Sequence, residues 1–219
     1  MRKIQAFWRS TVGKKVVMGV TGLIMIGYLI LHMLGNLQAF EGAEKINGYA
    51  ALLHGPLRGV VWGVRALLLA SLVLHVIAAA QLTLLDRAAR PAGYARKVAQ
   101  AATPASRTLR VGGVILLAFI VYHLLHFTTG QVHPDFVAGD VYHNLISGLG
   151  RPLVAGFYLI SMAAIGLHLY HGAWSSLRSL GLSQPKPDPL YRPVAAVVAV
   201  VLWLGFSIIP VAILLGWIR

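Results

Sequence analysis

Histidine is the residue type in this sequence with the richest chemistry. Nine histidines occur beside only six carboxylic acids and no cysteine in a chain of 219 residues. Four of them lie in four successive apolar segments: His32, His75, His123 and His168. An ionisable side chain at membrane depth is costly and usually faces a partner, a cavity or a cofactor. One such histidine could serve an interhelical hydrogen bond, but four on four segments favour bound metal, and without cysteine neither an iron–sulfur cluster nor a thiolate site is available.

Two of these histidines are expected near the outer surface of the membrane. At about 1.5 Å per helical residue, His32 lies about 25 Å beyond Lys15 and His123 about 20 Å beyond Arg110. We call these two residues the outer pair.

The other two histidines are expected nearer the cytoplasmic surface. By the same rise, His75 lies about 18 Å from Arg87 and His168 about 15 Å from Arg178. We call them the inner pair. One pair of imidazoles is what a six-coordinate b-type haem requires, and two pairs at two depths predict two haems. A lone metal ion would need three or four ligands at one depth.

Five apolar segments must position these side chains. The chain is 58% hydrophobic and only 11% charged, whereas soluble domains carry about 25% charged residues. Each segment reaches the roughly 20 residues that a helix needs to cross a bilayer. The sequence therefore predicts an all-α integral membrane bundle in one domain, residues 1–219. Its five transmembrane helices are expected at about 16–39, 57–85, 109–129, 152–177 and 194–218.

Lys and Arg are distributed unequally between the two sides of this predicted bundle. The N-terminus and the connections that follow the second and fourth helices hold 14 of them, including Arg90, Arg96 and Lys97, against 4 on the other side. Basic residues mark the cytoplasmic side, so the N-terminus is expected in the cytoplasm and the C-terminus outside. Topology also accounts for the net charge of +13, so no nucleic-acid partner is expected. The first apolar run is too long for a cleavable signal peptide and lacks an A-x-A exit.

Three stretches then resemble a known family. They are Ser10-Thr11-Val12-Gly13-Lys14-Lys15 with Thr21-Gly22-Leu23, the run Leu31-His32-Met33-Leu34-Gly35-Asn36-Leu37, and the run Leu167-His168-Leu169-Tyr170-His171-Gly172-Ala173-Trp174-Ser175 with Leu180-Gly181. The chain is similar over nearly its whole length to the cytochrome b membrane-anchor subunit of succinate dehydrogenases and fumarate reductases. The branch it resembles has a single anchor subunit with five helices and two haems.

This resemblance implies two haem b groups, with His75 and His168 as axial ligands of the inner haem and His32 and His123 of the outer haem. His171 competes with His168 for one of these roles and His126 with His123; otherwise they are candidates for propionate or quinone contacts. The resemblance also implies a flavoprotein subunit that carries FAD, an iron–sulfur subunit, and menaquinone or another quinone as electron acceptor. The complex is expected in a bacterial-type cytoplasmic membrane, as an oligomer of the heterotrimer.

Further residues are candidates from their location alone. Lys14, Ser10, Ser175 and Arg178 lie where haem propionates could be bound. His54 precedes the second helix on the outer side, and its near-neutral pKa suits proton exchange with a quinone. His133 and His143 are weaker candidates for the same role, and any of these loop histidines could simply be solvated.

Two other functions compete with this interpretation. The cytochrome b subunit of a hydrogenase or formate dehydrogenase also binds haem between membrane helices, but the helix count and the histidine-containing runs argue against it. A proton-coupled transporter could use membrane histidines as a relay. Such a transporter should contain repeats and membrane carboxylates, whereas the only charged residue within a predicted span and away from its ends is Arg65.

Overall fold

The computed structural model describes residues 2–89, 104–182 and 190–219, and all regular elements among them are helices. The chain order is α1 (Arg2–Arg9), α2 (Thr11–Leu37), η1 (Gln38–Glu41), α3 (Ala43–His54), α4 (Arg58–Ala88), α5 (Pro104–His123), η2 (Leu124–Thr128), α6 (Val141–Leu149), α7 (Pro152–Ser179) and α8 (Tyr191–Leu214). Arg90, Arg96, Lys97 and most of the proline-rich segment 183–193 lie outside the described residues.

Five of the described helices are long and apolar enough to cross a membrane, which confirms the predicted all-α bundle. These spans are Thr11–Glu41, Arg58–Ala88, Arg107–Thr128, Pro152–Ser179 and Tyr191–Leu214. Only 11 to 33% of the most apolar window of each span is buried inside the protein. The remaining surface carries large exposed apolar side chains such as Leu69, Val114 and Ile160, and hydrocarbon is the solvent that such a surface needs.

Local signals fix where the long helices begin and end. The first span starts at Thr11 rather than near residue 16, because the Ser10 hydroxyl accepts a hydrogen bond from the Gly13 N–H at 2.9 Å and caps the helix. Pro152 occupies the first turn of α7, where its missing N–H costs no hydrogen bond. The same helix ends before Gly181, whose φ of +76° belongs to a conformation that favours glycine.

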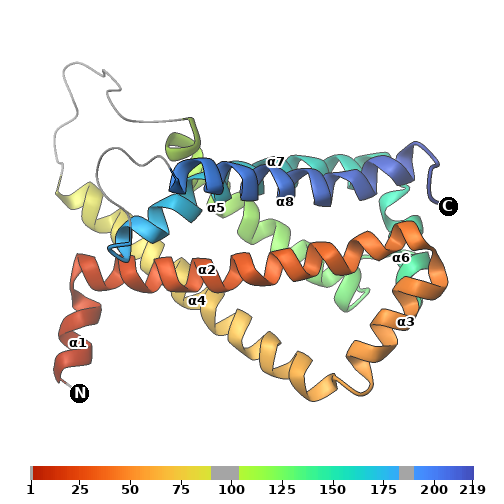
Figure 1. Cartoon of the computed structure of the whole chain (residues 1–219), viewed down its shortest axis with the longest axis horizontal. Helices are drawn as coiled ribbons and strands as arrows, with labels where there is room; N and C mark the ends of the chain where they lie inside the picture. The colour runs from red at the N-terminus through yellow and green to blue at the C-terminus, as the bar shows by residue number, and fades with distance from the viewer. Residues whose placement is uncertain (1, 90–103, 183–189) are drawn as a thin grey trace.

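The long helices pack against one another in a particular order (Figure 1). α2 packs against α4, α7 and α8, while α5 packs against α7, and α7 against α8. Within the described residues, α2 does not pack closely on α5, nor α4 on α7. These two pairs of helices therefore face each other across the bundle, and they are the helices that carry the outer and inner histidine pairs.

Two short helices cover one end of the bundle. α3 and α6 pack against each other at the end opposite α1, where the C-terminus also lies (Figure 1). The segments 41–55 and 130–150, expected to be loops, therefore contain helices. The Asn47 side-chain amide donates to Asp140 at 2.9 Å, and its oxygen accepts from the Tyr142 N–H at 3.0 Å. We call this end the cap end; it is the end predicted to lie outside.

Candidate metal centre

The inner pair brings together His75 of α4 and His168 of α7. Their ring centres are 6.3 Å apart and their planes differ by 53°. The His75 Nδ1 atom lies 3.1 Å from the Met18 carbonyl oxygen and 3.2 Å from the Thr21 hydroxyl. Since a carbonyl oxygen can only accept, we infer that Nδ1 carries the proton and Nε2 keeps its lone pair. Metal-binding imidazoles are held in this way.

His168 presents an unsatisfied nitrogen at the same level. Its Nδ1 atom is buried, and nothing in the described part of the chain hydrogen-bonds to it. A buried polar atom without a partner costs about 1–3 kcal/mol. At Gly113 of α5 an added Cβ would lie 3.8 Å from His168 Cε1. The inner site thus contains one buried imidazole nitrogen, His168 Nδ1, that no described residue pairs with.

The outer pair consists of His32 on α2 and His123 at the last position of α5. Their ring centres are 5.9 Å apart, and their planes are nearly perpendicular, at 83°. Tyr28 stacks on the His32 ring with centres 5.4 Å apart, and the Asn36 amide lies 3.3 Å from His32 Nε2. These contacts come from the same helix one turn before and one turn after His32, so the ring is held on both sides.

Both pairs have the spacing of two imidazoles on one metal atom. With a metal–nitrogen bond of about 2.0 Å on each side, the two ring centres are about 6 Å apart. Along α2, Thr21 contacts the inner pair and His32 lies eleven residues further, or about 16 Å at the helical rise. Along α7, Tyr158 contacts His123 and His168 lies ten residues further, or about 15 Å. Along both helices the inner pair and the outer pair are therefore separated by about the same distance, roughly 15 to 16 Å.

The surroundings of both pairs suit a flat cofactor better than a bare ion. No group of three or more His, Asp or Glu side chains that could hold an ion gathers among the described residues. The facing helices do not pack closely on each other in the described structure. Two imidazoles on helices that stand apart in this way fit the needs of a haem.

His126 lies apart from this centre. Its ring stacks between Tyr122, with centres 5.3 Å apart, and His133, with centres 4.7 Å apart. In a regular α-helix His123 and His126 would lie only about 60° apart on one face, which is why the sequence left both as candidates. Residues Leu124–Thr128 form a π-helical turn, which changes the direction of the side chains within it, and such turns are common at functional sites. The structure brings His123, not His126, against His32.

The other candidates at the N-terminal end of the bundle have partners within the protein. Lys14 is buried, and its ammonium donates to the carbonyl oxygens of Trp8 at 2.8 Å and Arg9 at 3.0 Å, closing the end of α1. Ser10 caps α2. Ser175 donates to the Gly172 carbonyl at 3.2 Å.

His171 and Arg178 both lie against Trp174 on α7. The His171 ring centre is 5.2 Å from that of the indole, and the Arg178 guanidinium lies 5.7 Å from the indole centre. Nothing in the described ranges hydrogen-bonds to the buried Nδ1 atom of His171. Arg192 of α8 also covers the indole, at 4.7 Å. The structure thus gathers two cations and an unpaired imidazole beyond the inner pair, toward the N-terminal end.

His54 lines a pocket of about 310 Å³ at the cap end. Arg58, Trp62 and Arg65 of α4 share the pocket, and the Arg65 guanidinium lies 5.1 Å from the Trp62 ring centre. No ion pair to either arginine occurs in the part of the chain that the structure describes. Sequence reasoning noted Arg65 only as evidence against a transporter. An arginine within an apolar span is a functional signal, and it should have made Arg65 a site candidate.

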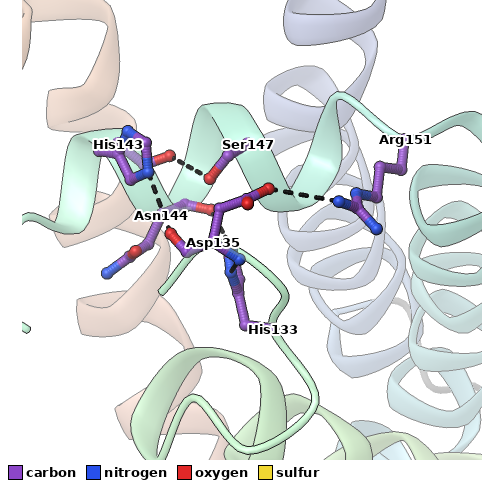
Figure 2. Close-up of polar contacts among 6 residues, drawn as sticks. All are labelled: His133, Asp135, His143, Asn144, Ser147 and Arg151. Carbon is purple, nitrogen blue, oxygen red and sulfur yellow. Dashed lines mark hydrogen bonds and ion pairs between the residues drawn. The ribbon is translucent and has the colours of Figure 1, made fainter. Parts of the chain in front are cut away.

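His133 and His143 belong to a polar cluster on the cap (Figure 2). His133 Nε2 lies 3.0 Å from the Asn144 carbonyl oxygen, and His143 Nε2 lies 3.0 Å from the Asp135 carbonyl oxygen. The Asp135 carboxylate pairs with Arg151 at 3.2 Å. These bonds tie the loop before α6 to the start of α7, so both histidines have structural partners.

Asp140 begins α6 with a charged cap. Its carboxylate accepts from the His143 N–H at 3.0 Å and from the Asn47 amide at 2.9 Å. These two hydrogen bonds, the first above all, lower the pKa of Asp140 below its ordinary value of 3.8. The carboxylate is therefore charged at neutral pH and stabilises the junction of α3 and α6.

Comparison of the chain with protein-family models, with curated proteins and with solved structures gives no match.

Proposed function

We propose that this protein is the cytochrome b membrane-anchor subunit of a succinate:quinone oxidoreductase. In this role it passes electrons from an iron–sulfur subunit through two b haems to menaquinone or another quinone. One observation carries the cofactor part of the proposal. In each pair the two histidines face each other across the bundle, with ring centres 6.3 Å apart in the inner pair and 5.9 Å apart in the outer pair. The succinate part rests on the sequence resemblance.

His75 and His168 would hold the inner haem, and His32 and His123 the outer one. Each haem b, when bound, supplies a one-electron redox centre whose two axial positions are filled by imidazole. The chain supplies ligand orientation through the Met18 carbonyl at His75 and the Tyr28 ring stacked on His32. The chain also surrounds both sites with helices whose exposed apolar side chains suit contact with lipid rather than water.

Cations stand at both ends of the proposed electron path, where haem propionates need partners. At the N-terminal end they are Arg178 and Arg192, beside Trp174. At the cap end Arg65 is the corresponding cation, and it lies over the Trp62 ring beside the pocket that His54 lines. Arg65 thus joins the propionate candidates.

The proposed direction of electron transfer, from the N-terminal end to the cap end, implies where the partners bind. A flavoprotein with FAD and an iron–sulfur subunit would dock at the basic N-terminal end, in the cytoplasm of a bacterial-type cell, and heterotrimers would associate further. The pocket lined by His54, Arg58, Trp62 and Arg65 is the candidate quinone site. His54 is exposed there, and its Nδ1 atom donates to the Ala50 carbonyl at 2.9 Å, which orients the ring.

Dithionite-reduced minus oxidised spectra of the purified chain test the cofactor part. We expect two b-type components in the wild type. His75→Ala and His168→Ala should each remove the same component, and His32→Ala and His123→Ala the other. His143→Ala, on the exposed cap, is the matched control and should keep both. A wild-type spectrum without a b-type absorption change would overturn the proposal.

Purification of the tagged chain from its native membrane tests the partner part. We expect it to bring down a flavoprotein and an iron–sulfur protein with succinate–dye activity. In the four ligand variants this activity should persist while succinate–quinone activity falls. Copurification of a hydrogenase or a formate dehydrogenase instead would reject the succinate assignment and keep the haems.

A further inference from the structure

Tyr158 bridges two histidines near the cap end. Its ring is buried on α7, with 6% of its surface exposed. Its hydroxyl oxygen lies 3.3 Å from His123 Nδ1 and 3.0 Å from His126 Nδ1. A hydroxyl has one proton, so it can donate to one of these nitrogens and accept from the other.

The direction of this bridge decides which histidine can bind metal. If Tyr158 donates to His123 Nδ1, the proton of that imidazole must reside on Nε2, and no lone pair points toward His32. If Tyr158 instead accepts from His123 Nδ1, its own proton goes to His126 Nδ1, and His123 Nε2 is left with a lone pair. Only the second arrangement is compatible with His123 as a ligand.

A rigid stack holds the His126 end of the bridge. The His126 ring is 1% exposed and lies between the rings of Tyr122 and His133. Gly148 of α6 backs both imidazoles, since an added Cβ would lie 2.8 Å from His133 Nε2 and 2.9 Å from His126 Cε1. Such distances leave no room for a side chain at this position.

Hydrogen bonds anchor the stack to the cap. The Asp135 N–H donates to His133 Nδ1 at 3.2 Å, so the other nitrogen, Nε2, carries the proton and donates to the Asn144 carbonyl at 3.0 Å. The Asp135 carboxylate in turn pairs with Arg151 at the start of α7 (Figure 2). His126 cannot turn without breaking this cluster, so its Nδ1 atom stays within hydrogen-bond distance of the Tyr158 hydroxyl, at 3.0 Å.

We propose that Tyr158 and His126 are positioning residues for the outer metal ligand. The His123 Nδ1–H donates to the Tyr158 hydroxyl, which donates to His126 Nδ1. This chain of hydrogen bonds holds the His123 ring nearly perpendicular to that of His32 and directs its Nε2 lone pair into the bundle. The inference rests on the proposed function and assigns His126 a role other than ligation.

The test compares Tyr158→Phe with Tyr122→Phe in the membrane-extracted protein. Tyr122 stacks on the same His126 ring, but its hydroxyl lies outside the bridge. An imidazole that donates through Nδ1 is a more basic ligand and favours oxidised iron. In Tyr158→Phe we expect both haems to stay bound, and the redox equilibrium of the outer haem to shift roughly tenfold toward the reduced form, which is about 59 mV for one electron.

The electron paramagnetic resonance signal of the oxidised outer haem should shift in the same variant, because that signal depends on the angle between the axial rings. The inner haem should be unchanged, and Tyr122→Phe should resemble the wild type in both measurements. His126→Phe, which keeps a stacked ring and removes the acceptor of the Tyr158 proton, should shift the outer haem in the same direction by a smaller amount, because Tyr158 can still accept from His123. It keeps the proposal testable if Tyr158→Phe fails to fold.

The outcomes separate this inference from the proposed function. A wild type without b haem would reject the proposed function. Two haems in the wild type with an unshifted outer haem in Tyr158→Phe and His126→Phe would overturn the inference alone. Equal shifts in Tyr158→Phe and Tyr122→Phe would also overturn it, since they would indicate general packing rather than the bridge. Loss of the outer haem in His126→Ala with His123→Ala unaffected would reverse the ligand assignment.

Discussion

The Nδ1 atom of His75 lies 3.1 Å from the carbonyl oxygen of Met18 on the neighbouring helix. A main-chain acceptor fixes the tautomer of this imidazole and cannot be removed by changing a side chain. The nearby Thr21 hydroxyl, at 3.2 Å, donates to the Val17 carbonyl at 2.7 Å and is a secondary partner. The inner site therefore depends more on close approach of α2 to α4 than on any one polar side chain.

The first prediction concerns that close approach. At Gly22 an added Cβ would lie 3.5 Å from His75 Cε1 and 3.7 Å from the Ser176 hydroxyl. Gly22→Leu should push His75 aside and remove the inner haem component from the difference spectrum, while the outer component reports that the bundle is folded. Thr21→Val keeps the shape and the Met18 acceptor, so both components should remain. Retention of the inner component in Gly22→Leu would contradict this account.

The second prediction concerns the cation near the outer pair. Arg65→Gln removes a positive charge that favours the reduced form of a nearby haem, so the potential of the outer haem should fall by about 59 mV for each tenfold change in its redox equilibrium. Arg58→Gln, two turns closer to the end of α4, is the matched control and should cause a smaller change. Redox titration measures both. Equal potentials in the wild type and Arg65→Gln would exclude Arg65 as a propionate partner.

The third prediction concerns helix packing beside the outer pair. At Gly205 of α8 an added Cβ would collide with the sulfur of Met33, which is 6% exposed and adjacent to His32. Gly205→Ala should lower stability by about 1–3 kcal/mol, the usual cost of overpacking. At Gly156 an added Cβ meets nothing within 4 Å, so Gly156→Ala should be neutral or slightly stabilising. Melting temperatures in detergent distinguish the two, and equal values would refute the packing argument.

The fourth prediction concerns pH and the cap. Because the folded pKa of Asp140 is lowered, its contribution to stability is present above the unfolded pKa and is lost as pH falls through the folded one. Asp140→Ala should lower stability by about 1 kcal/mol at neutral pH through loss of the helix cap. The difference between variant and wild type should disappear as the medium is acidified below about pH 3.8. If the stability difference persisted unchanged in acid, the charge of Asp140 would not be its cause.

Hydropathy was sufficient to predict the five spans, because crossing a bilayer demands long apolar helices whatever the tertiary contacts are. The depth of each histidine could be predicted from the helical rise, and the structure places the predicted pairs together. α3 and α6 were missed because both are short, and a short helix depends on packing, here of the two helices against each other.

Other features could not be predicted because they depend on three-dimensional contacts. The π-helical turn at Leu124–Thr128 separates His126 from His123, and no local motif marks it. The bridge through Tyr158 joins residues 35 and 32 positions apart in sequence. Two contacts of Lys14 were also beyond prediction: its ammonium donates to two carbonyl oxygens of α1.

Each histidine pair takes one residue from the first half of the chain, α2 or α4, and one from the second half, α5 or α7. The facing helices do not pack on each other in the described structure. During synthesis, neither proposed haem could therefore gain its second ligand until α5 or α7 has entered the membrane. Binding of the outer haem would show that the third span has been inserted correctly, and binding of the inner haem would show the same for the fourth. An anchor truncated before α5 would remain colourless.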